Sequence, residues 1–468
     1  MTFGESKMLG LSRRELLLGS AATGATFAAG GLAARASNSP DHTLTISPYE
    51  HSLLPGTVTR DMMSFAPDGP PPVLRMRRGE KAVVDVQNTL DEPSVVHWHG
   101  LRIANAMDGV PYLTQHPIEA GQTFRYEFTP PDAGTFWYHP HCNTLEQMGR
   151  GLTGVLIVEE DEDPGFDLDL PLNIRDFRLG GDGQFIEMFK ARNAARGGTY
   201  GTVSSVNWQV DPVYEVPAGG LVRLRLAVTD VTRVGTFGVE GGVAQVIALD
   251  SNPLPGPMSA ENMLLSPGQR ADVALRVPDE EGQDVTLFLR RPNGDKALTR
   301  FRATGTSANR QLADLKPLPA NPVPRPDLAN AEVIDFVFGW SPEGGAPQAS
   351  ICGSLGYTFW SINREAWPGD VPGPLDPLAR MKLGKSYVLR LRNESPNAHP
   401  IHLHGVSFQL LRSNKRKLPP LVTDTALLLE EETMEVALVA DNPGDWAFHC
   451  HVIEHQKTGL AGFLRIED

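Results

Sequence analysis

The chain contains an internal repeat, and this repeat limits its fold more than any other feature. Residues 76–100, MRRGEKAVVDVQNTLDEPSVVHWHG, align without a gap on residues 381–405, MKLGKSYVLRLRNESPNAHPIHLHG. A second segment, residues 131–141 (PDAGTFWYHPH), aligns on residues 442–451 (NPGDWAFHCH), so that two histidines of each segment coincide. The first and last parts of the chain are therefore copies of one unit.

A weaker third copy lies between these two. Leu265–Arg270 matches Ile118–Thr123, and Leu287 and Leu289 then stand where the outer copies have histidines. A chain of 468 residues has room for three domains of about 150 residues each. We predict domain 1 over residues 37–164, domain 2 over residues 165–315, a Pro-rich linker over residues 316–327 and domain 3 over residues 328–468.

Each unit has the residue pattern of β-structure. Apolar and polar residues alternate over residues 83–86, 124–128, 222–226 and 388–391, and Pro, Gly, Asn and Asp residues bound these runs. The counts of Gly (46) and Pro (39) favour many turns over long helices, with residues 143–149 as a candidate exception. The sequence predicts an all-β fold of three Greek-key β-sandwich or barrel domains.

Ten of the 13 histidines fall in four clusters, and none lies between residues 142 and 398. In a strand, residues i and i+2 face the same side, so each cluster presents two imidazoles in one direction. The pairs are His97 and His99, His139 and His141, His402 and His404, and His449 and His451. Because they come from the two homologous end domains, we expect one shared metal cluster at the interface of these domains.

Cys450 lies between His449 and His451 and is expected to face the opposite side of the strand. There it can join His399 and His455 in a set of one thiolate and two imidazoles, which is the ligand set of blue copper. One strand would then connect two metal centres.

The motifs HWHG, HPH, HPIHLHG and HCHVIEHQKTGL resemble, in this order, the four copper signatures of the three-domain multicopper oxidases, a family that includes laccases. The resemblance covers the chain after its N-terminal segment and implies cupredoxin-like domains, four copper ions and dioxygen as electron acceptor. It implies a type 1 copper on His399, Cys450 and His455, a type 2 copper on His97 and His402, and type 3 coppers on His99, His139 and His451 and on His141, His404 and His449.

Three positions near these motifs bear on the chemistry. Leu460 stands where many members of the family have an axial Met, and we expect a raised potential because leucine offers no lone pair. The resemblance implies that Asp108 donates protons to bound oxygen; the alternative is a turn residue in Met107-Asp108-Gly109. Gln456 replaces a second acid of some bacterial relatives, which leaves Glu454 as the neighbouring candidate.

The resemblance implies a laccase-like oxidase, which couples one-electron oxidation of phenols or aromatic amines near His455 to four-electron reduction of dioxygen to water. One alternative is a metallo-oxidase of Cu(I) or other metal ions in copper tolerance, which the dispersed methionines disfavour. Another is a non-catalytic scaffold of the cell-division type, which would be expected to lack histidines and the cysteine. A copper nitrite reductase would be expected to have two domains.

Residues 1–36 have the features of a twin-arginine export signal. Arg13 and Arg14 precede an Ala/Gly-rich stretch, and Ala34-Arg35-Ala36 is a small-x-small cleavage site. The alternative, a membrane anchor, needs about 20 strongly apolar residues. We therefore expect a periplasmic or secreted protein that has no membrane association once the signal is cleaved.

The composition of the chain bears on its partners and on its oligomeric state. The net charge of −14 and the lack of a basic stripe disfavour nucleic acid as a partner. Hydrophobic residues at 41% and charged residues at 21% are typical of a soluble globular protein, and we expect a monomer.

Cys142 and Cys352 form either a disulfide between domains 1 and 3 or two buried thiols.

Overall fold

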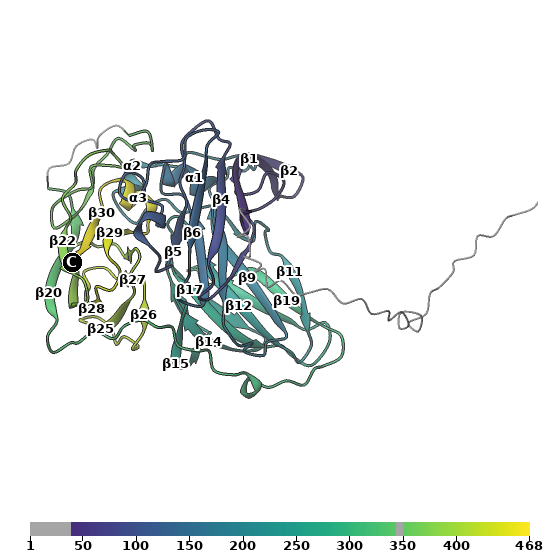
Figure 1. Cartoon of the computed structure of the whole chain (residues 1–468). Coiled ribbons are helices and arrows are strands. Elements are labelled where there is room, and N and C mark those ends of the chain that lie inside the picture. Colours follow the sequence, from purple (N-terminus) through teal and green to yellow (C-terminus); the bar gives the residue numbers. More distant parts are fainter. Residues whose placement is uncertain (1–38, 343–349) are drawn as a thin grey trace, which may run out of the picture. The chain divides into compact units, whose positions relative to one another are not determined.

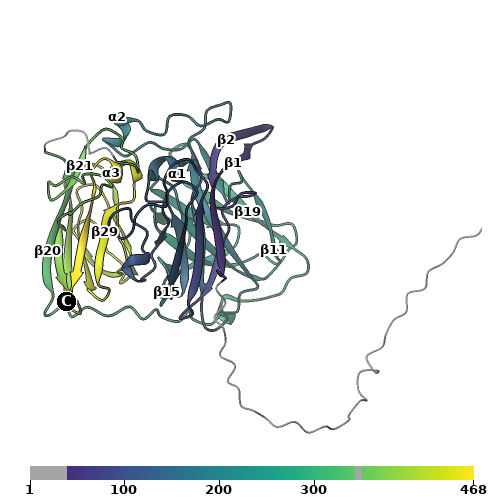
Figure 2. The same ribbon diagram turned by 45° about the horizontal axis from the view of Figure 1, so that its top comes forward.

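The computed structural model describes residues 39–342 and 350–468, so the predicted export signal lies outside the described residues. Pro40–Asp468 forms one compact unit, in which the strands pair into six sheets, two for each third of the chain (Figures 1 and 2). Each third has a continuous apolar core to which both of its sheets contribute. The prediction of an all-β fold built from three sandwiches is confirmed.

The first sandwich consists of two four-stranded sheets. In sheet order, the strands of one sheet are β2 (Thr57–Ser64), β1 (His42–Leu54), β4 (Ala82–Asn88) and β6 (Thr123–Phe128), and those of the other are β3 (Leu74–Arg77), β8 (Gly154–Glu159), β7 (Gly134–His139) and β5 (His97–His99). The expected alternation is present in β4, where Val84 and Val86 are fully buried. This face of β4 packs into the core of the sandwich.

The middle sandwich has one six-stranded and one five-stranded sheet. The first contains β10 (Val203–Val206), β9 (Leu168–Phe177), β12 (Leu221–Val228), β17 (Arg270–Arg276), β14 (Val243–Leu249) and β15 (Asn252–Ser259); the second contains β11 (Val213–Pro217), β19 (Lys296–Thr304), β18 (Asp284–Leu289), β13 (Gly235–Glu240) and β16 (Met263–Leu265). Leu287 and Leu289 lie in β18 and pack in the core. The positions that hold histidines in the two end copies of the repeat are therefore occupied by apolar core residues in this sandwich.

The third sandwich also has six and five strands. The first sheet contains β21 (Trp360–Ile362), β20 (Glu332–Trp340), β23 (Ser386–Asn393), β28 (Thr433–Val439), β25 (Phe408–Ser413) and β26 (Val422–Thr423); the second contains β22 (Ala379–Lys382), β30 (Ala461–Glu467), β29 (Gly444–Cys450), β24 (His399–Leu403) and β27 (Thr425–Leu428). Its strands, green to yellow, lie beside those of the first sandwich, purple to blue (Figures 1 and 2).

Helices are short and lie between strands. They are α1 (Thr144–Arg150), α2 (Ala191–Ala194), α3 (Ile453–Lys457) and the 3-10 turns Asn105–Met107 and Leu312–Asp314. The expected helix at residues 143–149 corresponds to α1. Within residues 39–342 and 350–468, no helix has the length and apolar character needed to cross a membrane. The predicted domain boundaries fall between strands and stay predictions.

The polar positions of β12 do not face water, although the alternating pattern is typical of a strand with one solvated face. Arg223 and Arg225 are both 2% exposed. The guanidinium of Arg223 contacts Asp272 at 2.6 Å, and Arg225 Nη1 donates to Thr135 Oγ1 of β7 at 3.0 Å. The polar face of β12 therefore packs against the first sandwich, and paired charges fill this interface.

Cys142 and Cys352 form a disulfide, which decides between the two alternatives left open by the sequence. Cys142 follows β7, and Cys352 precedes β21 in the last third of the chain. The amide of Asn143 also donates to the Cys352 carbonyl at 2.9 Å. The disulfide links the first sandwich to the chain segment that precedes β21 of the third sandwich.

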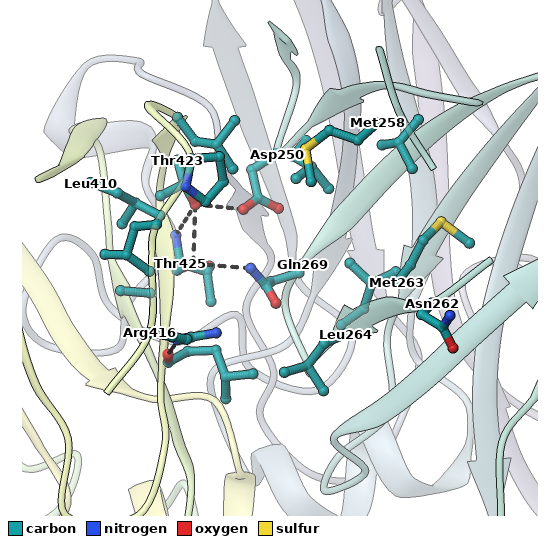
Figure 3. A pocket seen from close by; sticks show the side chains of 18 of the residues that line it. Asp250, Met258, Asn262, Met263, Leu264, Gln269, Leu410, Arg416, Thr423 and Thr425 are labelled. Atoms are coloured by element: carbon teal, nitrogen blue, oxygen red, sulfur yellow. Dashed lines mark hydrogen bonds between the residues drawn. The ribbon is translucent and has the colours of Figure 1, made fainter. Parts of the chain in front are cut away.

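A cavity of about 250 Å³ lies between the middle and third sandwiches. Figure 3 shows Asp250, Met258 and Gln269 on the side of the middle sandwich and Thr423 and Thr425 on the side of the third. Thr423 Oγ1 donates to Asp250 Oδ2 at 2.5 Å, which bridges the two sandwiches. The Thr425 side chain is part of the cavity wall and also contacts the histidines described below.

Candidate metal centres

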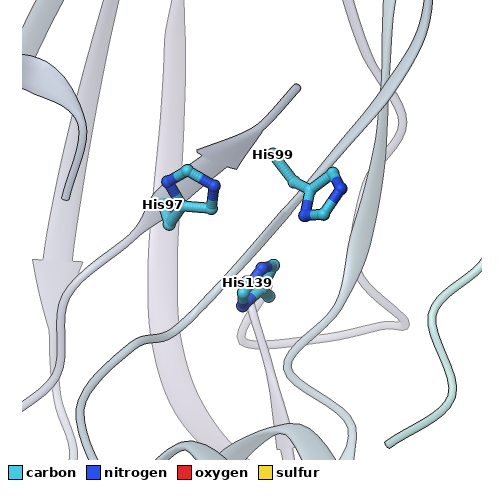
Figure 4. Close-up of side chains that lie close together, drawn as sticks. All are labelled: His97, His99 and His139. Atoms are coloured by element: carbon cyan, nitrogen blue, oxygen red, sulfur yellow. The ribbon is translucent and has the colours of Figure 1, made fainter. Parts of the chain in front are cut away.

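Histidine side chains from the first and third sandwiches converge on one buried space. His97 and His99 lie in β5, and Figure 4 shows them gathered with His139 from the adjacent strand β7. The ring centroids of His97 and His404 are 3.7 Å apart, and those of His99 and His402 are 3.8 Å apart. The histidines that converge are His97, His99, His139, His141, His402, His404, His449 and His451.

Strand alternation accounts fully for only one of the four pairs. Both members of the pair in β5 belong to the strand, whereas β7 ends at His139, β24 at Leu403 and β29 at Cys450. His141, His404 and His451 therefore follow the strand ends and reach the cluster from the turns beyond them. The tertiary packing of these turns, rather than the period of a strand, directs their rings inward.

The cluster contains buried ring nitrogens that have no hydrogen-bond partner among the described residues. They are His97 Nε2, His99 Nδ1, His139 Nε2, His141 Nε2, His402 Nε2 and both nitrogens of His451. Unpaired buried polar atoms are rare in proteins because each costs free energy. A bound metal ion would satisfy these lone pairs, so the donor set fits imidazole-bound copper.

Backbone carbonyls hold several of the opposite ring nitrogens. His97 Nδ1 lies 2.8 Å from the Asp108 carbonyl oxygen, and His402 Nδ1 lies 2.9 Å from that of Asp424. His449 Nδ1 is 3.0 Å from the Cys450 carbonyl. An Nδ1–H that donates to a carbonyl leaves the Nε2 lone pair directed into the cluster, as is usual for histidines that bind metals.

Burial favours the neutral form of several of these imidazoles. Desolvation, followed by the charge of neighbouring histidines, holds the pKa values of His99, His139 and His404 well below the ordinary value of 6.5. The pKa of His449 is lowered to about 3, again chiefly by burial. Only a neutral imidazole has the lone pair that binds a metal ion, so the folded chain presents its ligands in the metal-ready form.

Two buried aspartates contact the cluster, one of which was not recognised from the sequence. Asp108 Oδ2 lies 2.8 Å from His404 Nδ1, and Oδ1 lies 3.3 Å from His97 Nδ1. Asp424, the unrecognised residue, has its Oδ1 at 3.3 Å from His99 Nε2 and 3.4 Å from His402 Nδ1. Although burial opposes it, the Arg270 guanidinium at 2.6 Å lowers the pKa of Asp424. Asp424 belongs to no histidine motif, so the sequence carries no signal for it.

His399, Cys450 and His455 form a second, separate group in the third sandwich. Cys450 Sγ lies 3.6 Å from the Nδ1 atoms of both histidines, and these two nitrogens are 3.1 Å apart. All three side chains are fully buried. Burial raises the pKa of the Cys450 thiol, so the thiolate form depends on a bound cation. Two imidazoles and one sulfur in a triangle fit copper.

The remote nitrogens of this group are held by hydrogen bonds. Ser395 Oγ lies 2.8 Å from His399 Nε2, and the Arg196 carbonyl oxygen lies 2.5 Å from His455 Nε2. The second contact covers the edge of His455 at which we expected electron donors to bind. Leu460, the axial candidate, is buried in the same apolar core as Cys450, and its carbonyl accepts the Cys450 amide at 3.0 Å.

Strand β29 joins the two groups. Its register with β24 sets His449 opposite His402 and Cys450 opposite Ile401. Because neighbouring residues of a strand point to opposite faces, the Cys450 sulfur lies on the core side, away from the imidazoles. One peptide unit on either side of Cys450 separates it from a histidine of the cluster.

Glu454 lies in α3 and is bound by the middle sandwich. Arg178 Nη2 contacts its carboxylate at 3.2 Å, and Thr199 donates to it from both its backbone amide and its hydroxyl. Its predicted role in a proton relay stays a prediction, and these contacts tie α3 to the middle sandwich. Gln456, in the same helix, is 7% exposed.

Comparisons with known proteins agree with this geometry. Two family models, both described as multicopper oxidase, match residues 48–163 and 353–468. A solved multicopper oxidase of Pseudomonas thermotolerans is 39% identical, with a TM-score of 0.83 over 92% of this chain and 100% of the other. The Mycobacterium tuberculosis multicopper oxidase MmcO is 27% identical over 92% of this chain and 88% of its own length.

A fungal relative, the laccase of Pycnoporus cinnabarinus, is 26% identical over 84% of each chain. The two matched models include all ten clustered histidines and Cys450 between them. Together with the two buried donor sets, these matches identify the protein as an oxidoreductase that belongs to the multicopper oxidase family.

Proposed function

We propose that the protein is an exported, laccase-like oxidase of small aromatic electron donors, with dioxygen as the acceptor. The observation that carries the proposal is the pair of donor sets joined by β29: a triangle of one sulfur and two imidazoles, and a buried cluster of eight imidazoles. One set suits single-electron exchange, and the other has enough ligands for several metal ions that act on one small molecule.

We assign a type 1 copper to His399, Cys450 and His455, and a type 2 copper to His97 and His402. We assign the two type 3 coppers to His99, His139 and His451 and to His141, His404 and His449. Four copper ions bound in this way would supply one-electron oxidation of the donor and four-electron reduction of dioxygen to two waters. The donor atoms of His141, His404 and His449 lie within 4.8 Å of one another, as do those of His399, Cys450 and His455, which supports these two of the assignments.

The chain's own residues have defined tasks in this scheme. Cys450 contacts both imidazoles of its site, and its backbone carbonyl accepts from His449 Nδ1, so the bonds of Cys450 and one hydrogen bond connect the two sites. Asp108 is the residue we assign to proton delivery, because its carboxylate contacts two cluster histidines while 1% exposed. Export by the twin-arginine route is proposed from residues 1–36, and the disulfide is compatible with an oxidising compartment.

Copper content, visible absorption and oxygen consumption test the proposal. We expect about four copper ions per chain and the strong visible absorption of a copper thiolate. Oxygen consumption should be faster with 2,6-dimethoxyphenol than with Cu(I). The variant Cys450→Ser should lose the thiolate absorption and donor-driven oxygen consumption but keep the copper ions of the histidine cluster.

Other outcomes separate the alternatives. Rapid oxidation of Cu(I) with slow oxidation of the phenol would assign the protein to the metallo-oxidases. A protein that binds no copper after reconstitution and is inert with both donors would favour the scaffold function. At present that function has no support, since the matched families are oxidases and both donor sets are complete.

A further inference from the structure

The edge of His455 is closed to direct contact with a donor. The imidazole is fully buried, and its Nε2 lies 2.5 Å from the carbonyl oxygen of Arg196. Arg196 belongs to the middle sandwich and follows α2, which lies near α3 in Figures 1 and 2. A substrate would have to displace this backbone segment to touch the ring, so an electron from an outside donor has to pass through other protein groups to reach the site.

A buried tryptophan contacts both imidazoles of the site. The ring centroid of Trp360 lies 4.7 Å from that of His455 and 4.9 Å from that of His399. Trp360 is fully buried, and its Nε1–H donates to the Ala194 carbonyl of α2 at 2.8 Å. Both this hydrogen bond and the ring contacts hold the indole in place.

A second tryptophan continues the contact to the surface. Trp340 and Trp360 are direct partners in the antiparallel pairing of β20 with β21. Their rings stack with centroids 4.2 Å apart and an interplanar angle of 16°. Trp340 is 46% exposed, whereas Trp360 is inaccessible to solvent. Two parallel indoles therefore lead from solvent to the ligands His399 and His455.

We propose, on the basis of the oxidase function proposed above, that Trp340 is the docking residue for aromatic electron donors and that Trp360 relays the electron to His399 and His455. An electron-rich aromatic ring stacks on the exposed face of the Trp340 indole, as aromatic rings do on one another. Because the docking face is at the surface, the donor class includes aromatic molecules too large to reach a buried imidazole.

The electron balance of this step is simple. A phenolic donor loses one electron and releases its hydroxyl proton to water, which leaves a phenoxyl radical. The electron would pass through the two indoles, which are unchanged afterwards, and would reduce a copper ion held by His399, Cys450 and His455 by one electron. Four such electrons and four protons convert one dioxygen molecule into two waters, so dioxygen is the terminal oxidant.

Two substitutions form a matched pair for the test. Trp340→Leu keeps an apolar side chain but removes the aromatic face, whereas Trp340→Phe keeps a ring that can stack. Both leave the metal ligands intact, so copper content and the visible absorption of the type 1 site should equal those of the wild type. Under anaerobic conditions, 2,6-dimethoxyphenol is then mixed with each protein, and the loss of that absorption is followed.

We expect reduction by the phenol to be about five- to tenfold slower in Trp340→Leu than in the wild type, because the stacked contact is lost. In Trp340→Phe the rate of reduction should return most of the way to the wild-type rate. Reduction by hexacyanoferrate(II), which has no aromatic ring to stack, should respond less to Trp340→Leu than reduction by the phenol does. Equal phenol rates in the wild type and Trp340→Leu would overturn the proposal.

A measurement on the copper-free protein is independent of turnover. Addition of 1,3-dimethoxybenzene, which lacks an acidic hydroxyl, should shift the indole N–H signal of Trp340 in a ¹⁵N–¹H spectrum, with the signal assigned by its loss in Trp340→Phe. An unmoved Trp340 signal would count against docking at this residue, and this titration needs only the folded wild type. If the oxidase function were wrong, the wild type would lack the type 1 absorption or no donor would bleach it, whatever residue 340 is.

Discussion

At the scale of single residues, the cluster depends on which nitrogen of each histidine is free. Carbonyl oxygens of Asp108 and Asp424 orient His97 and His402, while the carboxylates of the same two residues contact His404 and His99. Each aspartate thus contacts two histidines with its carboxylate, and its backbone carbonyl also lies against one of them. A substitution of the side chain changes charge and proton transfer while the backbone contact remains.

Asp108→Asn tests the predicted proton donor. We expect steady-state oxygen consumption to fall by about 10- to 100-fold, because an amide cannot deliver protons. Substitution of a residue that contacts metal ligands commonly has an effect of this size. The anaerobic reduction of the type 1 site by a phenol should stay at the wild-type rate, because Asp108 contacts only the other cluster. Asp85→Asn, at a surface ion pair with Arg125, is the control. Unchanged oxygen consumption in Asp108→Asn would support the turn-residue alternative.

At the scale of elements, short segments between strands hold the sites together. Helix α3 has only five residues, too few to be stable alone. It carries His455 for the type 1 site and Glu454 for the contact with Arg178 and Thr199. Arg178 is 2% exposed and also donates to the Thr199 carbonyl and the Thr232 hydroxyl, so Glu454 completes a buried polar network.

Glu454→Gln separates a structural role from a catalytic one. If the carboxylate mainly neutralises Arg178, the variant should lose roughly 2–4 kcal/mol of unfolding free energy, because a buried guanidinium is left without its counter-charge. Oxygen consumption per bound copper should then stay near that of the wild type. Asp445→Asn, at the partly exposed pair with Arg465, should cost less than about 1 kcal/mol.

Urea unfolding of the copper-free wild type and of each variant gives the free energies of unfolding that are compared. A stable Glu454→Gln protein that binds copper normally but turns over slowly would instead favour the predicted proton relay.

At the scale of the whole molecule, the end sandwiches share one buried imidazole cluster, and the disulfide joins the same two parts of the chain. The middle sandwich supplies Arg270, which contacts Asp424, and Gly268, whose φ of +91° brings its backbone close to the cluster. A Cβ at Gly268 would lie 3.0 Å from His451 and 3.1 Å from His99. Each sandwich is therefore needed for the site, although only two contribute histidines to it.

Burial of so many neutral histidines makes the copper-free protein sensitive to acid. His449 and His455 have pKa values near 3 in the folded state against an ordinary value of 6.5, chiefly through desolvation. Between pH 6.5 and 3 the unfolded chain binds protons that the folded chain does not, so stability is lost as the pH falls. Each such histidine contributes up to about 1.4 kcal/mol per pH unit.

We therefore expect the unfolding free energy of the copper-free protein to fall by several kcal/mol between pH 6.5 and 5. Asp250 opposes this loss of stability. Burial raises its pKa to about 6, so as the pH falls the folded chain binds one proton there before the unfolded chain does. Copper-loaded protein is the control, because bound metal competes with protons for the same lone pairs. A copper-free protein with equal stability at pH 6.5 and pH 5 would contradict the prediction.

The repeat, the histidine pairs and the alternation of apolar residues were sufficient to predict an all-β chain and the ten histidines and Cys450 that gather into two groups. Ligand spacing is local, and local spacing is visible in one sequence. The contacts of Asp424 with His99 and Arg270, of the Arg196 carbonyl with His455 and of Glu454 with Arg178 join segments far apart in the chain. Only the packing of the three sandwiches decides these contacts, because no residue pattern within one segment records which distant backbone or ring lies against it.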